Sequence, residues 1–157
     1  MAKPLVPKPL ALTLGEPAGI GPDITIAAWL RRKELNLPPF YLLGDRAFVA
    51  RRAKALGASL SLVEVAAEEV ADAFAKALPV VATDQIPTAE PGRPDESSAP
   101  AALASIRQAV ADISSGRAAA IVTNPIAKNV LYKYGFADPG HTEYLARLSF
   151  EQSGDPA

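Results

Sequence analysis

Residues 10–23, "LALTLGEPAGIGPD", join a short apolar run to a glycine-rich turn and then to a proline followed by an acid. The apolar run Leu10–Leu14 is typical of a strand, and Gly15 ends it. Proline is accepted in the first turn of a helix, so Pro22 indicates a helix start, and Asp23 suits the positive end of that helix. The stretch therefore predicts a strand, a tight turn and a helix in succession.

The same alternation of strand and helix continues along the rest of the chain. Further strands are expected at residues 40–43, 60–65, 80–82 and 118–122, the last of them buried. Helices are expected at residues 22–32, 46–56, 67–78, 101–113, 127–134 and 142–150. Residues 87–100 contain four prolines and no apolar periodicity, which predicts an extended surface loop. Such alternation is typical of an α/β fold with an α/β/α layering, in which helices cover both faces of a mostly parallel sheet.

The composition narrows the class of protein. The chain has 157 residues, 49% of them hydrophobic and 21% charged, as expected for a soluble globular domain. The formal net charge is -1 and the basic residues are scattered, which argues against a nucleic-acid or membrane partner. The absence of cysteine excludes disulfides and thiolate metal sites, and the cytoplasm is the simplest location.

Ligands of open parallel sheets bind in loops beyond the carboxyl ends of the strands. The first such loop, Gly15–Asp23, resembles a phosphate-binding turn, because glycines allow close approach and helix amides attract anions. However, Ile24 occupies the place of the third glycine of the dinucleotide fingerprint, and Pro22 removes one amide donor. A tight strand-to-helix turn explains the glycines equally well.

The second loop, "TNPIAK" at residues 123–128, places an amide and an ammonium group after the strand expected at 118–122. Asn124 and Lys128 are therefore candidate contacts for an anion or a substrate, with Lys128 acting as a point charge. The simpler alternative is a solvated lysine on the first turn of a short helix, and on this pattern alone it is favoured.

The third loop, "DPGHT" at residues 138–142, contains the only histidine of the chain. Gly140 would permit an unusual backbone angle before His141, and Thr142 could cap the helix that follows. On this pattern alone, an ordinary helix start is the simpler interpretation. The functional alternative is a polar cluster of His141 and Thr142 at a helix N-terminus, where the positive helix end keeps the imidazole neutral.

Three motifs in order, "GEPAGIGPD", "VTNPIAK" and "GFADPGHTEYLA", closely resemble the N-terminal half of the 4-hydroxythreonine-4-phosphate dehydrogenase (PdxA) family. The resemblance implies a fold related to isocitrate and isopropylmalate dehydrogenases. It also implies NAD- or NADP-dependent oxidation of 4-phosphooxy-L-threonine in pyridoxal phosphate biosynthesis. The oxidation product is a 3-oxo acid that loses carbon dioxide to give 3-amino-2-oxopropyl phosphate. The histidine and threonine that contact substrate in the family correspond to His141 and Thr142.

The resemblance also implies features that this chain lacks. The family is a cytoplasmic homodimer that binds a divalent metal (Zn, Mg or Co) through three further histidines, whereas this chain has no second histidine. We therefore expect no metal ligand in this chain and place the ligands after Ala157. We expect residues 1–125 to form a first α/β domain that is incomplete without C-terminal segments. Residues 126–157 would then begin a second domain, in a chain truncated on its C-terminal side.

Three alternatives stay open at this stage. The first is a paralogous dehydrogenase of another phosphorylated hydroxy acid, such as phospho-D-threonate or phosphoerythronate, because the visible motifs separate these substrates poorly. The second is a non-catalytic, truncated module that binds an anionic metabolite, which the missing metal ligands favour. The third is an acyltransferase-like phosphate binder, which would explain the glycine-rich loop but not the other two motifs.

Overall fold

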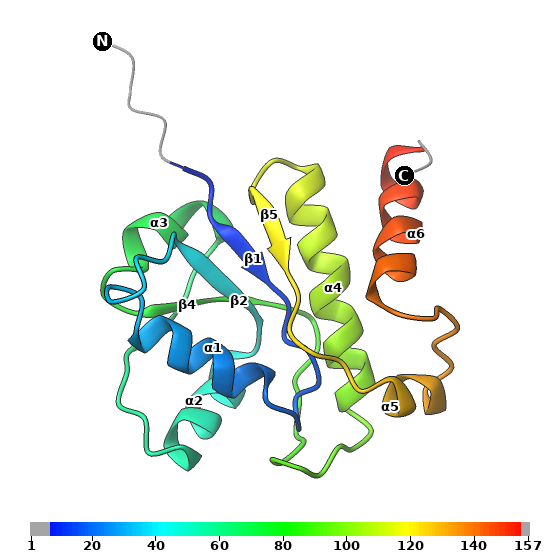
Figure 1. Ribbon diagram of the computed structural model, residues 1–157, viewed down its shortest axis with the longest axis horizontal. Coiled ribbons are helices and arrows are strands. Elements are labelled where there is room, and N and C mark those ends of the chain that lie inside the picture. Colours follow the sequence, from blue (N-terminus) through cyan, green and yellow to red (C-terminus); the bar gives the residue numbers. More distant parts are fainter. Residues whose placement is uncertain (1–6, 155–157) are drawn as a thin grey trace.

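The computed structural model describes residues 7–154 and contains a five-stranded sheet with the strand order β3-β4-β2-β1-β5 (Figure 1). Every pair of neighbouring strands is parallel. The strands are β1 (Leu10–Leu12), β2 (Phe40–Gly44), β3 (Leu62–Glu64), β4 (Leu78–Ala82) and β5 (Ala120–Val122). The predicted α/β fold with a mostly parallel sheet is confirmed.

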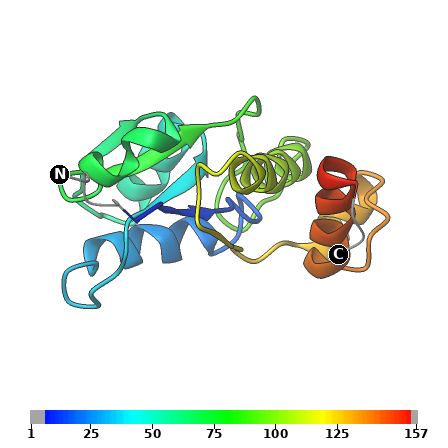
Figure 2. The same cartoon turned by 90° about the horizontal axis from the view of Figure 1, so that it is seen from above.

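Helices cover both faces of this sheet (Figure 2). One face packs with α1 (Gly21–Leu30) and α2 (Arg46–Ala55) in a core that includes Trp29, Leu42 and Phe48. The other face packs with the 3-10 turn η1 (Ala67–Glu69), α3 (Val70–Ala73) and α4 (Ser98–Ser114), around Tyr41 and Leu43. Because consecutive strand residues point to opposite faces, Tyr41 and Leu42 belong to different cores. The α/β/α layering predicted from the sequence is thus present.

A third cluster lies outside the sheet. Helices α5 (Lys128–Lys133) and α6 (His141–Ser153) pack against α4, and Figure 2 shows them on the far side of α4 from the sheet. Ile106 of α4, Leu131 of α5 and Tyr144 of α6 are among the buried side chains of this cluster. The helix at which the third motif begins therefore stands on α4 rather than directly on the sheet.

Two sequence predictions about the elements were wrong. The segment expected to be one helix at residues 67–78 contains the 3-10 turn η1 and the short helix α3, which ends at Ala73. Leu78 begins β4 instead of ending a helix, because proline disfavours the helical conformation in the residue before it and Pro79 follows Leu78. The strand expected to be buried, β5, lies at the end of the sheet, where β1 is its only partner among residues 7–154. As a result, Val122 is 43% exposed.

The loop predicted at residues 87–100 is confirmed over most of its length, but α4 begins earlier than expected, at Ser98. Pro100 falls in the first turn of α4, where a missing amide hydrogen costs no helical bond. The Gly92 amide donates to the Ala18 carbonyl oxygen at 2.8 Å, which ties this loop to the glycine-rich turn. Among residues 7–154, no helix is long and apolar enough to cross a membrane.

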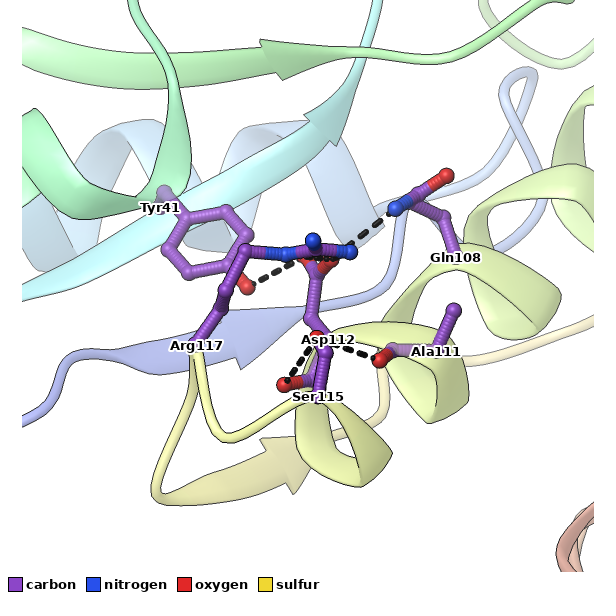
Figure 3. A network of polar contacts seen from close by, with 6 residues as sticks. All are labelled: Tyr41, Gln108, Ala111, Asp112, Ser115 and Arg117. Atoms are coloured by element: carbon purple, nitrogen blue, oxygen red, sulfur yellow. Dashed lines mark hydrogen bonds and ion pairs between the residues drawn. The ribbon is translucent and has the colours of Figure 1, made fainter. Parts of the chain in front are cut away.

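A buried polar network joins β2 to the end of α4 (Figure 3). The Tyr41 hydroxyl donates to Asp112 at 2.6 Å, Gln108 donates to the same carboxylate at 2.9 Å, and Arg117 pairs with it at 3.0 Å. Burial, reinforced by the Asp112 carboxylate, raises the pKa of Tyr41 far above its usual range. Asp112 is 1% exposed, and these three donors compensate the cost of burying its charge.

Candidate functional site

The carboxyl ends of β1 and β5 lie side by side, because Leu12 of β1 pairs with Val122 of β5. This register brings the loop after β1, the glycine-rich loop of residues 15–23, against the loop after β5. Thr13 donates its amide to the Val122 carbonyl oxygen at 3.0 Å, and Glu16 donates its amide to the Pro125 carbonyl oxygen at 2.8 Å. The first two sequence motifs therefore form one packed unit.

Two glycines of the glycine-rich loop are required for this packing. A Cβ added at Gly15 would lie 2.5 Å from the Pro125 carbonyl oxygen and 2.9 Å from the Asn124 Cβ, and Gly15 also has a φ of +71°. A Cβ at Gly21 would lie 2.8 Å from the Leu14 carbonyl oxygen and 2.9 Å from the Asn124 Cβ. All four distances are shorter than real Cβ contacts, so close packing against Leu14 and residues 124–125 explains the two glycines.

Three amides of the glycine-rich loop, those of Glu16, Ala18 and Gly19, donate hydrogen bonds within the protein. The Ala18 amide donates to the Glu16 side chain at 3.0 Å, and the Gly19 amide donates to the Glu16 carbonyl oxygen at 2.9 Å. The Glu16 amide donates to Pro125, whereas the amides of Ile20, Gly21 and Asp23 at the start of α1 make no described hydrogen bond. The loop lacks the third glycine of the dinucleotide fingerprint, and we assign no cofactor contact to it.

Arg52 of α2 binds the glycine-rich loop through its side chain. Its guanidinium is 4% exposed, pairs with Asp23 in the first turn of α1 and donates to the Gly19 carbonyl oxygen. A buried charge with these two partners is satisfied, so the contact fixes the loop without offering a free cation. Sequence reasoning missed Arg52, because nothing in α2 marks one arginine of the run Arg51-Arg52 as buried.

Asn124 is buried between the two loops. Its side-chain amide donates to the Thr13 carbonyl oxygen and to the Thr25 hydroxyl, both at 2.9 Å, and its backbone amide donates to the Thr13 hydroxyl at 3.1 Å. The Thr25 hydroxyl in turn donates to the Gly21 carbonyl oxygen at 2.9 Å, so its oxygen is free to accept from Asn124. Both donors of the Asn124 amide are thus directed at protein acceptors. As an anion contact, Asn124 stays a prediction.

Lys128 and His141 are close to each other although they belong to different helices. Lys128 is the first residue of α5, and His141 is the first residue of α6. The Lys128 Nζ lies 3.5 Å from the position that a Cβ on Gly140 would occupy, and the Glu143 Oε2 lies at the same distance from that point. No described acidic group lies within ion-pair distance of Lys128 in residues 7–154. The Lys128 ammonium is exposed and stands beside the start of α6.

His141 is partly buried, and its Nε2 atom is itself buried and has no hydrogen-bond partner in the described part of the chain, so a ligand would have to displace neighbouring atoms to reach it. Burial of the ring, with a further contribution from the Lys128 ammonium, lowers the pKa of His141 below its ordinary value of 6.5. The imidazole is therefore neutral at pH 7. A neutral imidazole beside an ammonium group at a helix N-terminus can donate a hydrogen bond to an anionic or hydroxylated ligand.

Two expectations about this helix start were wrong. Gly140, at the N-cap, has φ -177° and ψ -166°, an extended conformation that any residue can adopt, so no unusual backbone angle is present. Thr142 does not cap α6, because the helix begins one residue before it, at His141. Thr142 is exposed in the first helical turn, where Glu143 contributes the expected acidic residue. The structure thus places Thr142 next to His141 on the surface.

Other polar features lie away from these residues. A cleft of about 570 Å³ is lined by Pro94, Asp95, Glu96, Ala99, Val130, Lys133 and Tyr134, so it contains none of the four candidate residues.

Within residues 7–154, no three histidine, cysteine or acidic side chains are grouped so that they could hold a metal ion. The described residues therefore do not fit the divalent metal that the family resemblance implies.

The chain is similar in sequence to proteins of one known family. The family model described as pyridoxal phosphate biosynthetic protein PdxA matches residues 36–154. A curated 4-hydroxythreonine-4-phosphate dehydrogenase of Bradyrhizobium diazoefficiens is 68% identical over 157 residues, which cover 95% of this chain and 46% of the relative. The chain thus spans about half the length of the curated relatives that it matches.

The fold of the chain is also similar to solved structures of dehydrogenases. The crystal structure of a 4-hydroxythreonine-4-phosphate dehydrogenase from Burkholderia phymatum matches with a TM-score of 0.78 and 25% identity, over 90% of this chain and 43% of that chain. A terephthalate 1,2-cis-dihydrodiol dehydrogenase from Burkholderia xenovorans matches with a TM-score of 0.66 and 26% identity, over 90% of this chain and 40% of that chain. Both are named dehydrogenases, and their names give different substrates.

Proposed function

The chain belongs to the family of the pyridoxal phosphate biosynthetic protein PdxA, and on that premise we propose that it forms part of the substrate site of a 4-hydroxythreonine-4-phosphate dehydrogenase. Its curated relatives carry that name, but this chain corresponds to less than half of each. The proposed reaction is the oxidation of 4-phosphooxy-L-threonine to a 3-oxo acid, which decarboxylates to 3-amino-2-oxopropyl phosphate. NAD or NADP accepts the hydride when it is bound.

One observation supports this proposal above the others: the unpaired Nε2 of His141 lies at the start of α6, close to the Lys128 ammonium. The substrate carries a phosphate and a carboxylate, both of which are attracted by an ammonium group and by the positive end of a helix. The 13-residue length of α6 is sufficient for an appreciable helix dipole. A site with this charge suits a phosphorylated amino acid.

Within this proposal each residue has a separate task. His141, which is neutral at pH 7, donates a hydrogen bond to substrate, and the Thr142 hydroxyl offers a second contact from the adjacent exposed position. Lys128 supplies positive charge without being committed to an acidic partner in residues 7–154. Holding the substrate in one orientation is worth several orders of magnitude in rate, so these contacts affect turnover as well as affinity. We assign no metal-dependent step to the described residues.

The wider assignments are proposals of the same kind. We propose that the complete enzyme is a cytoplasmic homodimer, that a divalent metal (Zn, Mg or Co) is bound outside this chain, and that a second domain begins near residue 126. The described chain supports the last point in one respect, because α5 and α6 pack on α4 and add no strand to the sheet.

A second candidate function is favoured by a specific observation. The likeness to a terephthalate dihydrodiol dehydrogenase indicates that this fold accommodates different dehydrogenase substrates. A paralogue acting on phospho-D-threonate or phosphoerythronate would retain an anion-attracting site at Lys128 and His141. The non-catalytic alternative, an anion-binding module, is supported by the lack of a metal-binding group in residues 7–154.

Steady-state kinetics on a substrate panel separate these functions. The assay uses a protein that includes this chain and has the full length of the curated relatives. Its substrates are 4-phosphooxy-L-threonine, phospho-D-threonate and phosphoerythronate. The proposal predicts that kcat/KM is highest for 4-phosphooxy-L-threonine by about tenfold or more, which corresponds to about 1.4 kcal/mol of transition-state discrimination. Preference for either of the other two acids would assign the chain to a paralogue, and turnover of none would favour the binding module.

A further inference from the structure

The loops that carry the first two motifs pack closely against each other. Asn124 is the centre of this packing, since Gly15 and Gly21 both approach its Cβ and its amide reaches Thr13 and Thr25. The burial of Asn124 and the direction of its two amide hydrogens indicate a role inside the protein rather than on its surface.

The contacts of Asn124 fix the chain that leads to Lys128. The backbone amide of Asn124 is held by the Thr13 hydroxyl, and the next residue, Pro125, accepts a hydrogen bond from the Glu16 amide. Ile126 packs against the cluster between α4, α5 and α6. Only Ala127, the N-cap of α5, separates this anchored segment from Lys128.

We propose that Asn124 is a positioning residue, which fixes residues 125–127 against the glycine-rich loop and thereby holds the Lys128 ammonium beside His141. In this account the glycine-rich loop is the support against which the second loop packs. The arrangement explains why Gly15 and Gly21 leave room for Asn124. The purpose of the arrangement rests on the proposed function, but the arrangement itself can be tested without substrate.

The single histidine of the chain provides a direct probe of this arrangement. The proton on Cε1 of its ring gives a single signal, so an NMR titration of the 157-residue chain reports the pKa of His141 without an assignment problem. The Lys128 ammonium contributes to the lowering of that pKa, and a displaced Lys128 would contribute less. The measured pKa of His141 therefore shows whether the Lys128 ammonium stays close to the ring.

The key variant is Asn124→Ala, which introduces no charge. It keeps the Cβ against which Gly15 and Gly21 pack and removes only the amide. The reference variant is Lys128→Gln, which removes the ammonium while leaving the anchored segment unchanged. We expect both variants to raise the pKa of His141 toward 6.5, and we expect the double variant to raise it no further than Lys128→Gln alone.

A matched control separates positioning from a general loss of stability. Tyr41→Phe removes a different buried hydrogen bond, that to Asp112, and should destabilise the chain without moving the pKa of His141. If Asn124→Ala fails to fold, Thr25→Val takes its place, because it removes one acceptor of the Asn124 amide and preserves the shape of the side chain.

The outcomes are distinct. The proposal is overturned if Lys128→Gln raises the pKa of His141 but Asn124→Ala and Thr25→Val leave it unchanged in folded protein. It is also overturned if Tyr41→Phe raises that pKa as much as Asn124→Ala does. Because no substrate is present, failure here leaves the proposed function standing, and failure of the substrate kinetics leaves this positioning role standing.

Discussion

The side-chain amide of Asn124 donates to the carbonyl oxygen of Thr13 at 2.9 Å, although the two residues are 111 positions apart in the sequence. This bond joins the carboxyl ends of β1 and β5, which are neighbours in the sheet. In a parallel sheet those ends share one edge, and this edge is where ligands of such folds bind. The packing at the edge determines where the start of α5, and with it Lys128, is placed.

The close approach of Gly21 to the second loop predicts an unusual effect of alanine. In the first turn of a helix alanine is normally favoured over glycine, by up to about 1 kcal/mol. At Gly21, however, the new Cβ would meet the Leu14 carbonyl oxygen and the Asn124 Cβ, so we expect Gly21→Ala to lower the free energy of unfolding by about 1–3 kcal/mol. Urea denaturation followed by circular dichroism measures this change.

Gly19→Ala in the same loop is the control for that experiment. A Cβ at Gly19 has its nearest contact at 3.2 Å, with the Glu16 carbonyl oxygen, and a smaller loss of stability is expected. Equal stability of the Gly19 and Gly21 variants would mean that the close packing against Asn124 is not present.

The Tyr41–Asp112 bond predicts a second stability effect. Tyr41→Phe would leave a buried carboxylate with one donor fewer, and we expect a loss of about 1–3 kcal/mol in the free energy of unfolding. Tyr132→Phe is the matched control, because the Tyr132 hydroxyl is exposed and its bond to the Pro139 carbonyl oxygen is long, at 3.4 Å. Chemical denaturation of the two variants should rank them clearly, and a larger loss for Tyr132→Phe would contradict the described network.

The lowered pKa of His141 predicts a pH dependence of stability. Since the ring takes up a proton more readily in the unfolded chain than in the folded chain, the folded state loses stability as the pH falls below the ordinary value of 6.5. His141→Gln should remove this contribution. The Lys128 ammonium of α5 and the Glu143 carboxylate of α6 are the charged groups nearest to the start of α6.

The measurement compares urea denaturation of the wild-type chain and the His141→Gln variant at about pH 7.5 and about pH 5.5, on either side of the histidine range. Between these values the wild-type chain should lose more free energy of unfolding than the variant does. Equal losses in the two proteins would show that His141 has an unshifted pKa.

The described residues also predict what the 157-residue chain does by itself. Because residues 7–154 contain no group of side chains that could hold a metal, we expect no metal-dependent reduction of NAD by this chain with 4-phosphooxy-L-threonine. Absorbance of NADH at saturating substrate and added divalent metal tests this expectation. Robust turnover by the purified chain would refute it and would require a catalytic site within these residues.

The sequence predicted the order of strands and helices well, because apolar runs, glycines and prolines act locally. The start of α1 at Gly21-Pro22 follows from proline's fit to a first helical turn. That Leu78 is not helical was predictable, since Pro79 restricts the residue before it, but acidic residues early in the segment and Lys76 late in it suggested a helix longer than α3.

The contacts within the candidate site could not be predicted from the sequence. The partners of Asn124 depend on the pairing of β1 with β5, which no local pattern specifies, and the burial of Arg52 depends on the packing of α2 against α1. The first two motif loops were identified correctly as lying beyond the carboxyl ends of strands, whereas the loop at residues 138–142 joins α5 to α6 and follows no strand. The packing of the first two loops on each other and the approach of the Lys128 ammonium to the neutral imidazole of His141 could be seen only in the three-dimensional structure.

The central claim is that His141 and Thr142 bind substrate and do not bind metal. The most direct test is the His141→Ala variant, made in a protein that includes this chain and has the full length of the curated relatives. Two quantities are measured on the same sample: kcat/KM for 4-phosphooxy-L-threonine, and the amount of bound metal. We expect kcat/KM to fall by about tenfold or more while the metal content stays close to that of the wild type. An unchanged kcat/KM, or a stoichiometric loss of metal, would contradict the account.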